Sequence, residues 1–182
     1  MVRRSSGIAA FDPGSRSTGA VALLPNGDVF RHRVWSRRDG ASITGYARWV
    51  AKQATDLAVD LEREIYPAPS ATFRIAFAVE GIVAIVPQAR RRPINPMPLV
   101  ETGVVLGAIA HAFGEDLVVV RPGNHGGNEL GYYPAELVTD AERRLDGWQL
   151  RVGKTSKLRH ARSAYDVALA VQNPLSSTGR EF

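Results

Sequence analysis

The sequence of 182 residues contains no cysteine. This absence excludes disulfide bonds, zinc sites built from cysteine and a thiol nucleophile. It also fits a reducing compartment, so we expect the protein in the cytoplasm.

Long apolar runs are missing as well. Glu80, Glu101 and His111 interrupt the longest ones, and none reaches the roughly 18 residues of a membrane span. The basic N-terminus has too short an apolar region for a signal peptide. No internal repeat or second domain is visible. We therefore expect no membrane association and a single domain over residues 1–182, with its core in about 7–172 and short tails.

Positive charge is in excess, with 23 Lys and Arg against 18 Asp and Glu, a net charge of +5 and an isoelectric point near 10.0. The basic residues occur in clusters, namely Arg31, Arg33, Arg37 and Arg38, then Arg90 to Arg92, then Lys154, Lys157, Arg159 and Arg162. Clustered basic charge predicts a polyanionic partner, most simply a nucleic acid. The alternative is that the charge serves solubility alone.

The pattern of apolar residues predicts a mixed α/β fold. Strands are expected at residues 7–12, 19–25, 29–35, 72–81 and 116–122. Long helices are expected at 43–65, 96–113 and 156–174, and a Gly-rich loop at 123–137 precedes or overlaps a short helix at 134–145. The turn "NGD" at 26–28 predicts a hairpin. The first three strands then form a meander, and the later strands are linked by helices.

Carboxylates stand at the ends of two predicted strands. Asp12 lies in "AFDPGSRSTG", where it is either an ordinary turn residue or a metal ligand at a sheet edge, and Glu80 closes "IAFAVEG". The helix between them is a crossover, so the two strands run parallel and both acids lie at one edge of the sheet. A third acid, Asp166, stands among small and apolar residues in the last helix. Three such carboxylates can bind hard cations such as Mg²⁺.

At these three positions the sequence resembles the RuvC-like Holliday junction resolvases of the RNase H-like superfamily, and the shortened phage-encoded members most of all. The matching motifs, in order, are "AFDPGSRSTG", "FAVEG" and "SAYDVALAV", and the resemblance covers about residues 7–172. It implies an RNase H-like α/β fold, a mixed five-stranded sheet in βββαβαβα order with helices on both faces.

The resemblance also implies an activity, a Mg²⁺-dependent endonuclease that resolves four-way DNA junctions. Asp12, Glu80 and Asp166 would be catalytic and would hold two ions roughly 3.5–4 Å apart, with Mn²⁺ able to replace Mg²⁺. A homodimer is implied because a junction has approximate two-fold symmetry. The second long helix, with Gly103, Gly107 and Ala110, is one candidate for the dimer surface. A phage-encoded member would act in the host cytoplasm.

One position departs from the family pattern. The family usually carries an acid or a histidine three residues before the last Asp, and this chain has Ser163 there. His160 lies one helical step further back. It reaches a metal, the attacking water or a phosphate only if the helix presents that side, and otherwise it is a surface histidine beside arginines. We name His160 and Ser163 as auxiliary site residues.

Phosphate contacts are expected from Arg90, Arg91 and Arg92, which follow Glu80 closely, and from Lys154 and Lys157. The Gly-rich loop "NHGGNELG" either grips DNA or is only a loop. Three acids, Asp140, Glu142 and Asp146, are expected on a solvated face. Trp35, Trp49 and Trp148 either stack on bases or pack in the core and at its rim.

Three other functions remain open. A nuclease of the same fold would act on flaps, other branched DNA or structured RNA, as in a related ribosomal-RNA-processing family. A junction-binding protein that has lost catalysis is conceivable because of Ser163, although Asp12, Glu80 and Asp166 argue against it. An actin-like or sugar-kinase ATPase also begins with Asp-x-Gly, but it usually needs two such domains.

Overall fold

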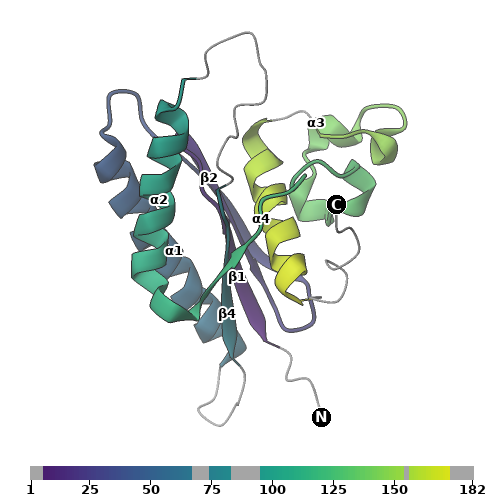
Figure 1. Cartoon of the computed structure of the whole chain (residues 1–182). Coiled ribbons are helices and arrows are strands. Elements are labelled where there is room, and N and C mark those ends of the chain that lie inside the picture. The colour runs from purple at the N-terminus through teal and green to yellow at the C-terminus, as the bar shows by residue number, and fades with distance from the viewer. Residues whose placement is uncertain (1–5, 67–73, 83–94, 154–155, 173–182) are drawn as a thin grey trace, which may run out of the picture.

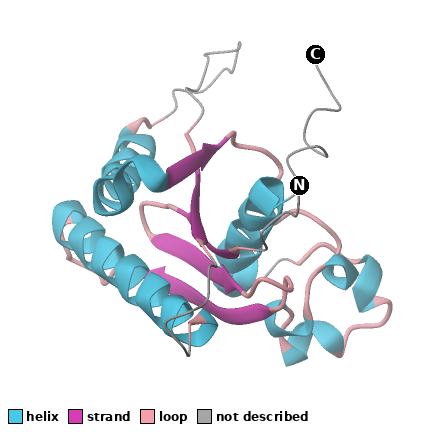
Figure 2. Ribbon diagram, turned by 90° about the horizontal axis from the view of Figure 1, so that it is seen from below, coloured by secondary structure: helices cyan, strands magenta, loops and turns pink. Residues whose placement is uncertain are grey.

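A five-stranded mixed sheet in the order β3-β2-β1-β4-β5 separates two helical layers in the computed structural model, which describes residues 6–66, 74–82, 95–153 and 156–172. The strands are β1 (Gly7–Asp12), β2 (Ser17–Leu23), β3 (Val29–Ser36), β4 (Ile75–Glu80) and β5 (Leu117–Val120). The helices α1 (Ile43–Ile65) and α2 (Met97–Phe113) cover one face, and α4 (Ser156–Gln172) covers the other (Figure 1; Figure 2). The short helix α3 (Asp140–Arg143) belongs to the segment between β5 and α4.

The strand directions are those that the sequence predicts. Strands β1, β2 and β3 pair antiparallel, β4 runs parallel to β1, and β5 runs parallel to β4. The predicted hairpin turn forms at 26–28, where Gly27 has φ +91° and the amide of Leu24 donates to the carbonyl of Asp28 at 2.9 Å. The strand bounds differ from expectation, since β2 begins earlier and β5 is shorter. The predicted mixed five-stranded sheet with helices on both faces is confirmed.

The two faces of β1 supply two separate cores because successive side chains of a strand point to opposite sides. Ala9 and Phe11 pack in the core below α1 and α2, whereas Ile8 and Ala10 pack against α4. The Phe11 ring stacks on Phe113, with the ring centroids 5.5 Å apart. The strand that carries Asp12 is therefore held from both sides.

The stripe predicted for α1 is confirmed, and the one predicted for α2 is only partly right. Helix α1 begins at the N-cap Ser42, whose hydroxyl accepts from the amide of Gly45, and its apolar stripe is buried. Leu106 and Phe113 of the predicted stripe do pack against the core. The fully buried residues of α2, however, are Val105 and Ile109, and the predicted stripe of Leu99, Gly103, Leu106, Ala110 and Phe113 contains neither. The helix is apolar on nearly all sides, so periodicity could not identify the packed face.

Helix α2 corrects the expectation that no apolar stretch reaches the length of a membrane span, because by length and composition α2 with the turn after it could cross a membrane. The segment Met97–Asp116 has a mean hydropathy of 1.4, and only 11% of it is buried. A core helix of a water-soluble protein passes the same test. The apolar outer face of α2 is therefore an exposed surface of this chain, and the expectation of no membrane association stays a prediction.

Between β5 and α4 the chain forms short turns where the sequence predicts a helix at 134–145. The segment contains 3₁₀ turns at Leu130–Tyr132, Ala135–Leu137 and Trp148–Leu150 and the four-residue helix α3. Thr139 and Glu142 form a capping box that starts α3. This segment lies beside α4 (Figure 1), and its residues Leu130, Leu137 and Val138 share a small core with Ala161.

Glu142 corrects one expectation from the sequence. It was placed on a solvated face with Asp140 and Asp146, but only 4% of it is exposed. Its carboxylate accepts hydrogen bonds from the guanidinium of Arg162, which is fully buried, at 3.2 Å. Asp140 and Asp146 are exposed as predicted. The sequence placed Glu142 wrongly because its partner lies on α4, far along the chain.

Candidate active site

The candidate site lies at the edge of the sheet where β1 and β4 end. Asp12 is the last residue of β1, and Glu80 is the last residue of β4. The parallel register pairs Phe11 with Val79, so the two carboxylates occupy equivalent positions on neighbouring strands. The geometry of parallel strands brings them together as the sequence predicts.

Helix α4 reaches this edge because β2 carries a glycine beneath it. A Cβ atom on Gly19 would lie 2.0 Å from the carbonyl oxygen of His160, which is far inside a van der Waals contact. Gly19 pairs with Asp12 in the β1–β2 ladder. The glycine therefore lets the helix backbone approach the sheet directly beside the first carboxylate.

Two side chains of α4 contact the carboxylates at the strand ends. The Nδ1 atom of His160 lies 2.7 Å from Oδ2 of Asp12. The Ser163 hydroxyl donates to Oε2 of Glu80 at 3.0 Å. Helix α4 thus turns His160 toward the sheet edge, and the histidine is not a free surface residue. Ser163 occupies the place of the expected acid or histidine and binds Glu80 through a neutral hydroxyl.

The Gly-rich loop supplies a histidine that the sequence analysis did not identify. The Nδ1 atom of His125 lies 3.0 Å from Oε1 of Glu80, and the amide of Gly123 donates to the same oxygen at 3.4 Å. Both ring and carboxylate are largely buried, with 17% and 15% of their side chains exposed. The loop is therefore part of the site, and its "NHGG" pattern, a histidine among turn residues, was the available signal.

The residue after His125 holds the third carboxylate. The amide of Gly126 donates to Oδ2 of Asp166 at 2.7 Å. Gly126 has φ +72°, and a Cβ atom there would lie 2.8 Å from the carbonyl oxygen of Arg159 and 3.1 Å from the amide of Ser163. Only glycine combines this backbone conformation with so close an approach to α4.

Two further donors converge on the same oxygen of Asp166. The side-chain amide of Asn128 donates at 3.2 Å, and the hydroxyl of Tyr133 donates at 3.1 Å. The other oxygen, Oδ1, is buried and has no hydrogen-bond partner among the described residues. One oxygen of Asp166 is therefore occupied by three donors, and the other is left for a proton or a cation.

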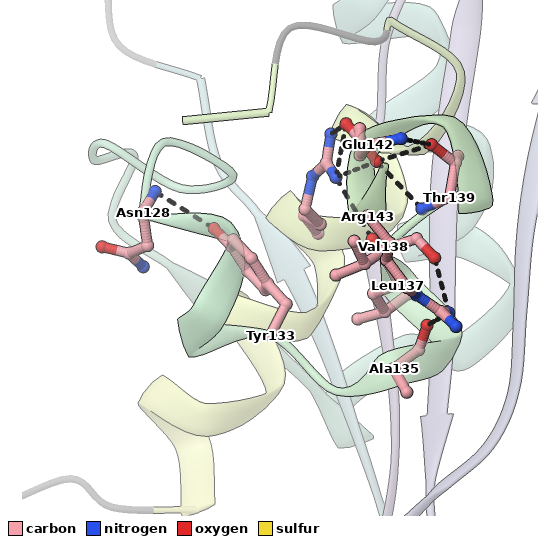
Figure 3. A network of polar contacts seen from close by, with 9 residues as sticks. Asn128, Tyr133, Ala135, Leu137, Val138, Thr139, Glu142 and Arg143 are labelled. Atoms are coloured by element: carbon pink, nitrogen blue, oxygen red, sulfur yellow. Dashed lines mark hydrogen bonds and ion pairs between the residues drawn. The ribbon is translucent and has the colours of Figure 1, made fainter. Parts of the chain in front are cut away.

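Tyr133 is itself fixed by its surroundings (Figure 3). The amide of Asn128 donates to its hydroxyl at 3.2 Å, and the guanidinium of Arg162 lies over its ring, 5.8 Å from the centroid. Arg162 also donates to the carbonyl of Leu137 and to Glu142. The buried ion pair thus anchors the segment that positions the Tyr133 hydroxyl.

Burial and charge shift the pKa values of these groups in different directions. Burial raises the pKa of Asp12, and the nearby Glu80 raises it further, although His160 opposes the shift. Burial also raises the pKa of Asp166 despite its three donors. Burial acts to raise the pKa of Glu80 too, but hydrogen bonds from His125 and Ser163 outweigh it, and the pKa is lowered.

The three carboxylates together affect the pKa of His125. Its hydrogen bond to Glu80 raises the pKa of the imidazole, and the charges of Glu80, Asp166 and Asp12 add to this effect against partial burial. The imidazole therefore lies in the combined field of the three carboxylates. Where the carboxylates are ionised, this field favours a cation at the sheet edge.

The donor set fits a hard divalent cation. Carboxylate oxygens are the ligands that Mg²⁺ and Mn²⁺ prefer, and the free, buried Oδ1 of Asp166 is costly unless a proton or a cation satisfies it. In the part of the chain that the structure describes, no three His, Asp or Glu side chains are yet placed so that they could hold a metal ion together. The metal-binding role of Asp12, Glu80 and Asp166 stays a prediction.

The structure does not describe every predicted DNA-binding residue. Arg90, Arg91, Arg92 and Lys154 lie outside the described residues. Lys157 is exposed in the first turn of α4. Trp35 is 6% exposed and belongs to the core, whereas Trp49 is 43% exposed. Core packing therefore accounts for Trp35 but leaves Trp49 open to another role.

Comparison with known proteins finds similarity in structure alone. No family model matches the sequence, and no curated protein matches it. The fold is similar to that of T. thermophilus RuvC in complex with a Holliday junction substrate, with a TM-score of 0.53 and 14% identity over 95% of this chain and 97% of that chain. A second structure of Thermus thermophilus RuvC gives a TM-score of 0.52 and 17% identity, over 92% of this chain and 96% of that chain. The predicted resemblance to RuvC is thereby confirmed at the level of the fold.

Proposed function

We propose that this chain is an endonuclease that depends on a divalent cation and resolves four-way DNA junctions. One observation supports the proposal: Asp12 and Glu80 end the neighbouring parallel strands β1 and β4, and one loop contacts Glu80 through His125 and Asp166 through Gly126. These are the three acids of the resolvase-like motifs. The fold shared with RuvC supports it, and so does the net charge of +5, which suits a phosphate backbone.

Some residues of the site would hold a cation, and others orient the groups that hold it. Asp12, Glu80 and Asp166 would bind Mg²⁺ or Mn²⁺, and the bound metal would supply Lewis-acid activation of water and of the phosphodiester. His160 orients Asp12, while Ser163 and His125 orient Glu80. One oxygen of Asp166 accepts hydrogen bonds from Gly126, Asn128 and Tyr133. The other oxygen, Oδ1, would then be the one that binds the metal ion.

The proposal includes a homodimer, because resolving a junction needs two matched nicks. The outer face of α2 supports this, since Met97 and Val100 are 56% and 59% exposed. A Cβ atom on Gly107 would meet open space, so a second copy can approach this helix closely. Sedimentation of the purified chain tests the dimer, and a monomer at micromolar concentration would contradict it.

The activity is tested with labelled four-way junction, flap, linear duplex and structured RNA, each with Mg²⁺, Mn²⁺ or EDTA. We expect metal-dependent cutting of the junction. Asp12→Asn should reduce cutting by at least about 100-fold and leave junction binding equal or tighter, because it removes a negative charge near the DNA. Asp146→Asn, at an exposed acid away from the site, is the matched control.

The outcomes separate the alternatives. Cutting of flaps or RNA in place of junctions would indicate a related nuclease of the same fold. Junction binding by the wild-type chain without cutting in either metal would indicate a binding protein that has lost catalysis. Undiminished cutting by Asp12→Asn would remove Asp12 from the site.

A further inference from the structure

A basic groove lies at the same end of the sheet as Asp12, on the β2–β3 side. Two adjoining hollows of about 330 and 390 Å³ share Ser36 and Arg38. The lining of the first hollow includes Tyr46 and Trp49 of α1. The other is lined by polar and charged residues, namely Arg16, Ser17, Ser36, Arg37, Arg38, Asp39, Gly40 and Glu101. We call these two neighbouring hollows, which share Ser36 and Arg38, the groove. The function proposed above does not account for it.

The charged groups of the groove are not equivalent. Arg37 is already engaged, because its guanidinium donates to Glu101 at 3.0 Å and to the carbonyl of Ala41 at 2.8 Å. Arg16 and Arg38 are exposed and form no ion pair within the described ranges. Asp39 is the remaining acid on the rim. The groove therefore presents two available guanidinium groups on a loop that Arg37 holds in place.

The backbone and two hydroxyls tie this basic pair to the sheet. The amide of Arg37 donates to the carbonyl of Arg16 at 2.8 Å, which joins the β1–β2 turn to the loop after β3. Ser17 and Ser36 pair across the strands, with their hydroxyl oxygens 3.3 Å apart. Guanidinium groups beside hydroxyls are the usual contacts of a phosphodiester.

Trp49 adds an aromatic surface at the other end of the groove. It is 43% exposed, and its ring lies 6.2 Å from that of Tyr46, measured between centroids. The Tyr46 hydroxyl lies 3.0 Å from Oγ1 of Thr18 and 2.7 Å from the carbonyl oxygen of Trp35. These contacts fix Tyr46, whose ring in turn packs beside that of Trp49. An exposed aromatic ring beside basic side chains can stack on a nucleic-acid base.

We infer that this groove binds one unpaired DNA strand, with phosphates on Arg16 and Arg38 and a base stacked on Trp49. Arg16 follows Asp12 by four residues, so their Cα atoms lie at most about 14 Å apart. A strand in the groove therefore continues toward the carboxylate edge. That this strand is the one that is cut rests on the proposed function. That an unpaired strand binds in the groove does not.

The inference gives a physical basis for selecting branched DNA over duplex. Bases in a continuous duplex are stacked on their neighbours and cannot offer a free face to Trp49. Bases at a branch point or in a single strand can do so at little cost. Loss of Trp49 should therefore weaken binding to unpaired strands and leave binding to a paired duplex unchanged.

The test measures binding in EDTA, so that cutting plays no part. Labelled oligodeoxythymidylate, a four-way junction and a paired duplex are titrated with the full chain by fluorescence anisotropy. Trp49→Ala should weaken oligodeoxythymidylate binding about 5- to 150-fold, and Trp49→Phe should restore part of it. Arg16→Ala and Arg38→Ala should each reduce the slope of log K against log salt by about 0.7. Arg63→Ala, an exposed arginine in the last turn of α1, is the matched control.

Each outcome decides the inference separately from the proposed function. Wild-type affinity for oligodeoxythymidylate in all three alanine variants would overturn it, even where the junction is still cut. Equal losses on duplex and single strand in Trp49→Ala would overturn the stacking role. A changed oligomeric state with unchanged DNA binding would assign the groove to a protein contact instead. Loss of binding in these variants would support it, even if no metal induces cutting.

Discussion

The hydroxyl of Tyr133 donates a hydrogen bond to Oδ2 of Asp166 at 3.1 Å, and Gly126 and Asn128 donate to the same oxygen. Among the residues that the structure describes, Oδ1 of that carboxylate has no hydrogen-bond partner. The tyrosine comes from the segment after β5, and the acid comes from the middle of α4. A long-range contact thus sets which oxygen of the acid is available. This relationship is specific enough to be tested by removing one atom.

Tyr133→Phe deletes the hydroxyl and keeps the ring. We expect the affinity for Mn²⁺, measured by calorimetry, to fall about tenfold or more, because groups that orient metal ligands typically have effects of this size. The free energy of unfolding in urea should fall by about 1–3 kcal/mol, since the amide of Asn128 also loses its acceptor. Tyr132→Phe is the control, because the Tyr132 side chain is exposed. Equal Mn²⁺ affinity in the two variants would contradict the positioning role.

Gly19→Ala tests the close approach of α4 to the sheet. The new methyl group would lie 2.0 Å from the carbonyl oxygen of His160, so the helix must move away from β2. We expect a loss of more than about 3 kcal/mol in unfolding free energy, at the upper end of the range for overpacked cores. Gly107→Ala, measured at protein concentrations where the chain is monomeric, is the matched control, because in the single chain its methyl group meets open space inside a helix. That change should stabilise the chain by about 0.5–1 kcal/mol. A mild effect of Gly19→Ala would contradict the packing of α4 described above.

The pair of His125 and Glu80 predicts a pH dependence of stability in EDTA. The raised pKa of His125 means that its contribution is full below the ordinary histidine value of about 6.5 and is lost as pH rises through the folded value. The lowered pKa of Glu80 means that its contribution is present above the ordinary value of about 4.3 and is lost as pH falls through the folded value. The pair therefore stabilises the folded chain most between about pH 4.3 and about pH 6.5.

His125→Gln measures this contribution by urea unfolding at two pH values. Near pH 5.5 the variant should be less stable than the wild-type chain by about 1.5 kcal/mol, the lower range for a hydrogen bond to a charged group. Near pH 8.5 the difference should shrink as the imidazole loses its proton. His111→Gln, an exposed histidine on α2, is the control. A difference that does not change with pH would show that the imidazole contributes through packing alone.

Replacing Arg90, Arg91 and Arg92 together with Ala should reduce the salt dependence of junction binding. Up to three phosphate contacts are lost, and each contributes about −0.9 to the slope of log K against log salt on duplex arms. The slope should therefore become shallower by as much as about 2.7. Circular dichroism checks that the variant is folded. An unchanged slope would place the binding surface elsewhere, with the groove of Arg16 and Arg38 as the next candidate.

The edge of the sheet could be predicted in detail because its determinants are local. The apolar runs that end in Asp12 and Glu80, the hairpin at 26–28 and the stripe of α1 each follow from backbone periodicity. The rule that crossover helices join parallel strands then brings the two acids together. The packed face of α2 could be predicted only in part, because a helix that is apolar all round carries little periodic signal.

The sequence by itself determined the order of strands and helices, the sheet edge shared by Asp12 and Glu80 and the basic character of the chain. Tertiary structure alone decided that His125 contacts Glu80, that His160 turns to Asp12, and that Glu142 is buried against Arg162. The physical reason is that periodicity records burial against the nearest layer, whereas these contacts depend on the path of an irregular segment over α4. That path is set by the positive φ of Gly126 and by side chains that meet only after the chain has folded.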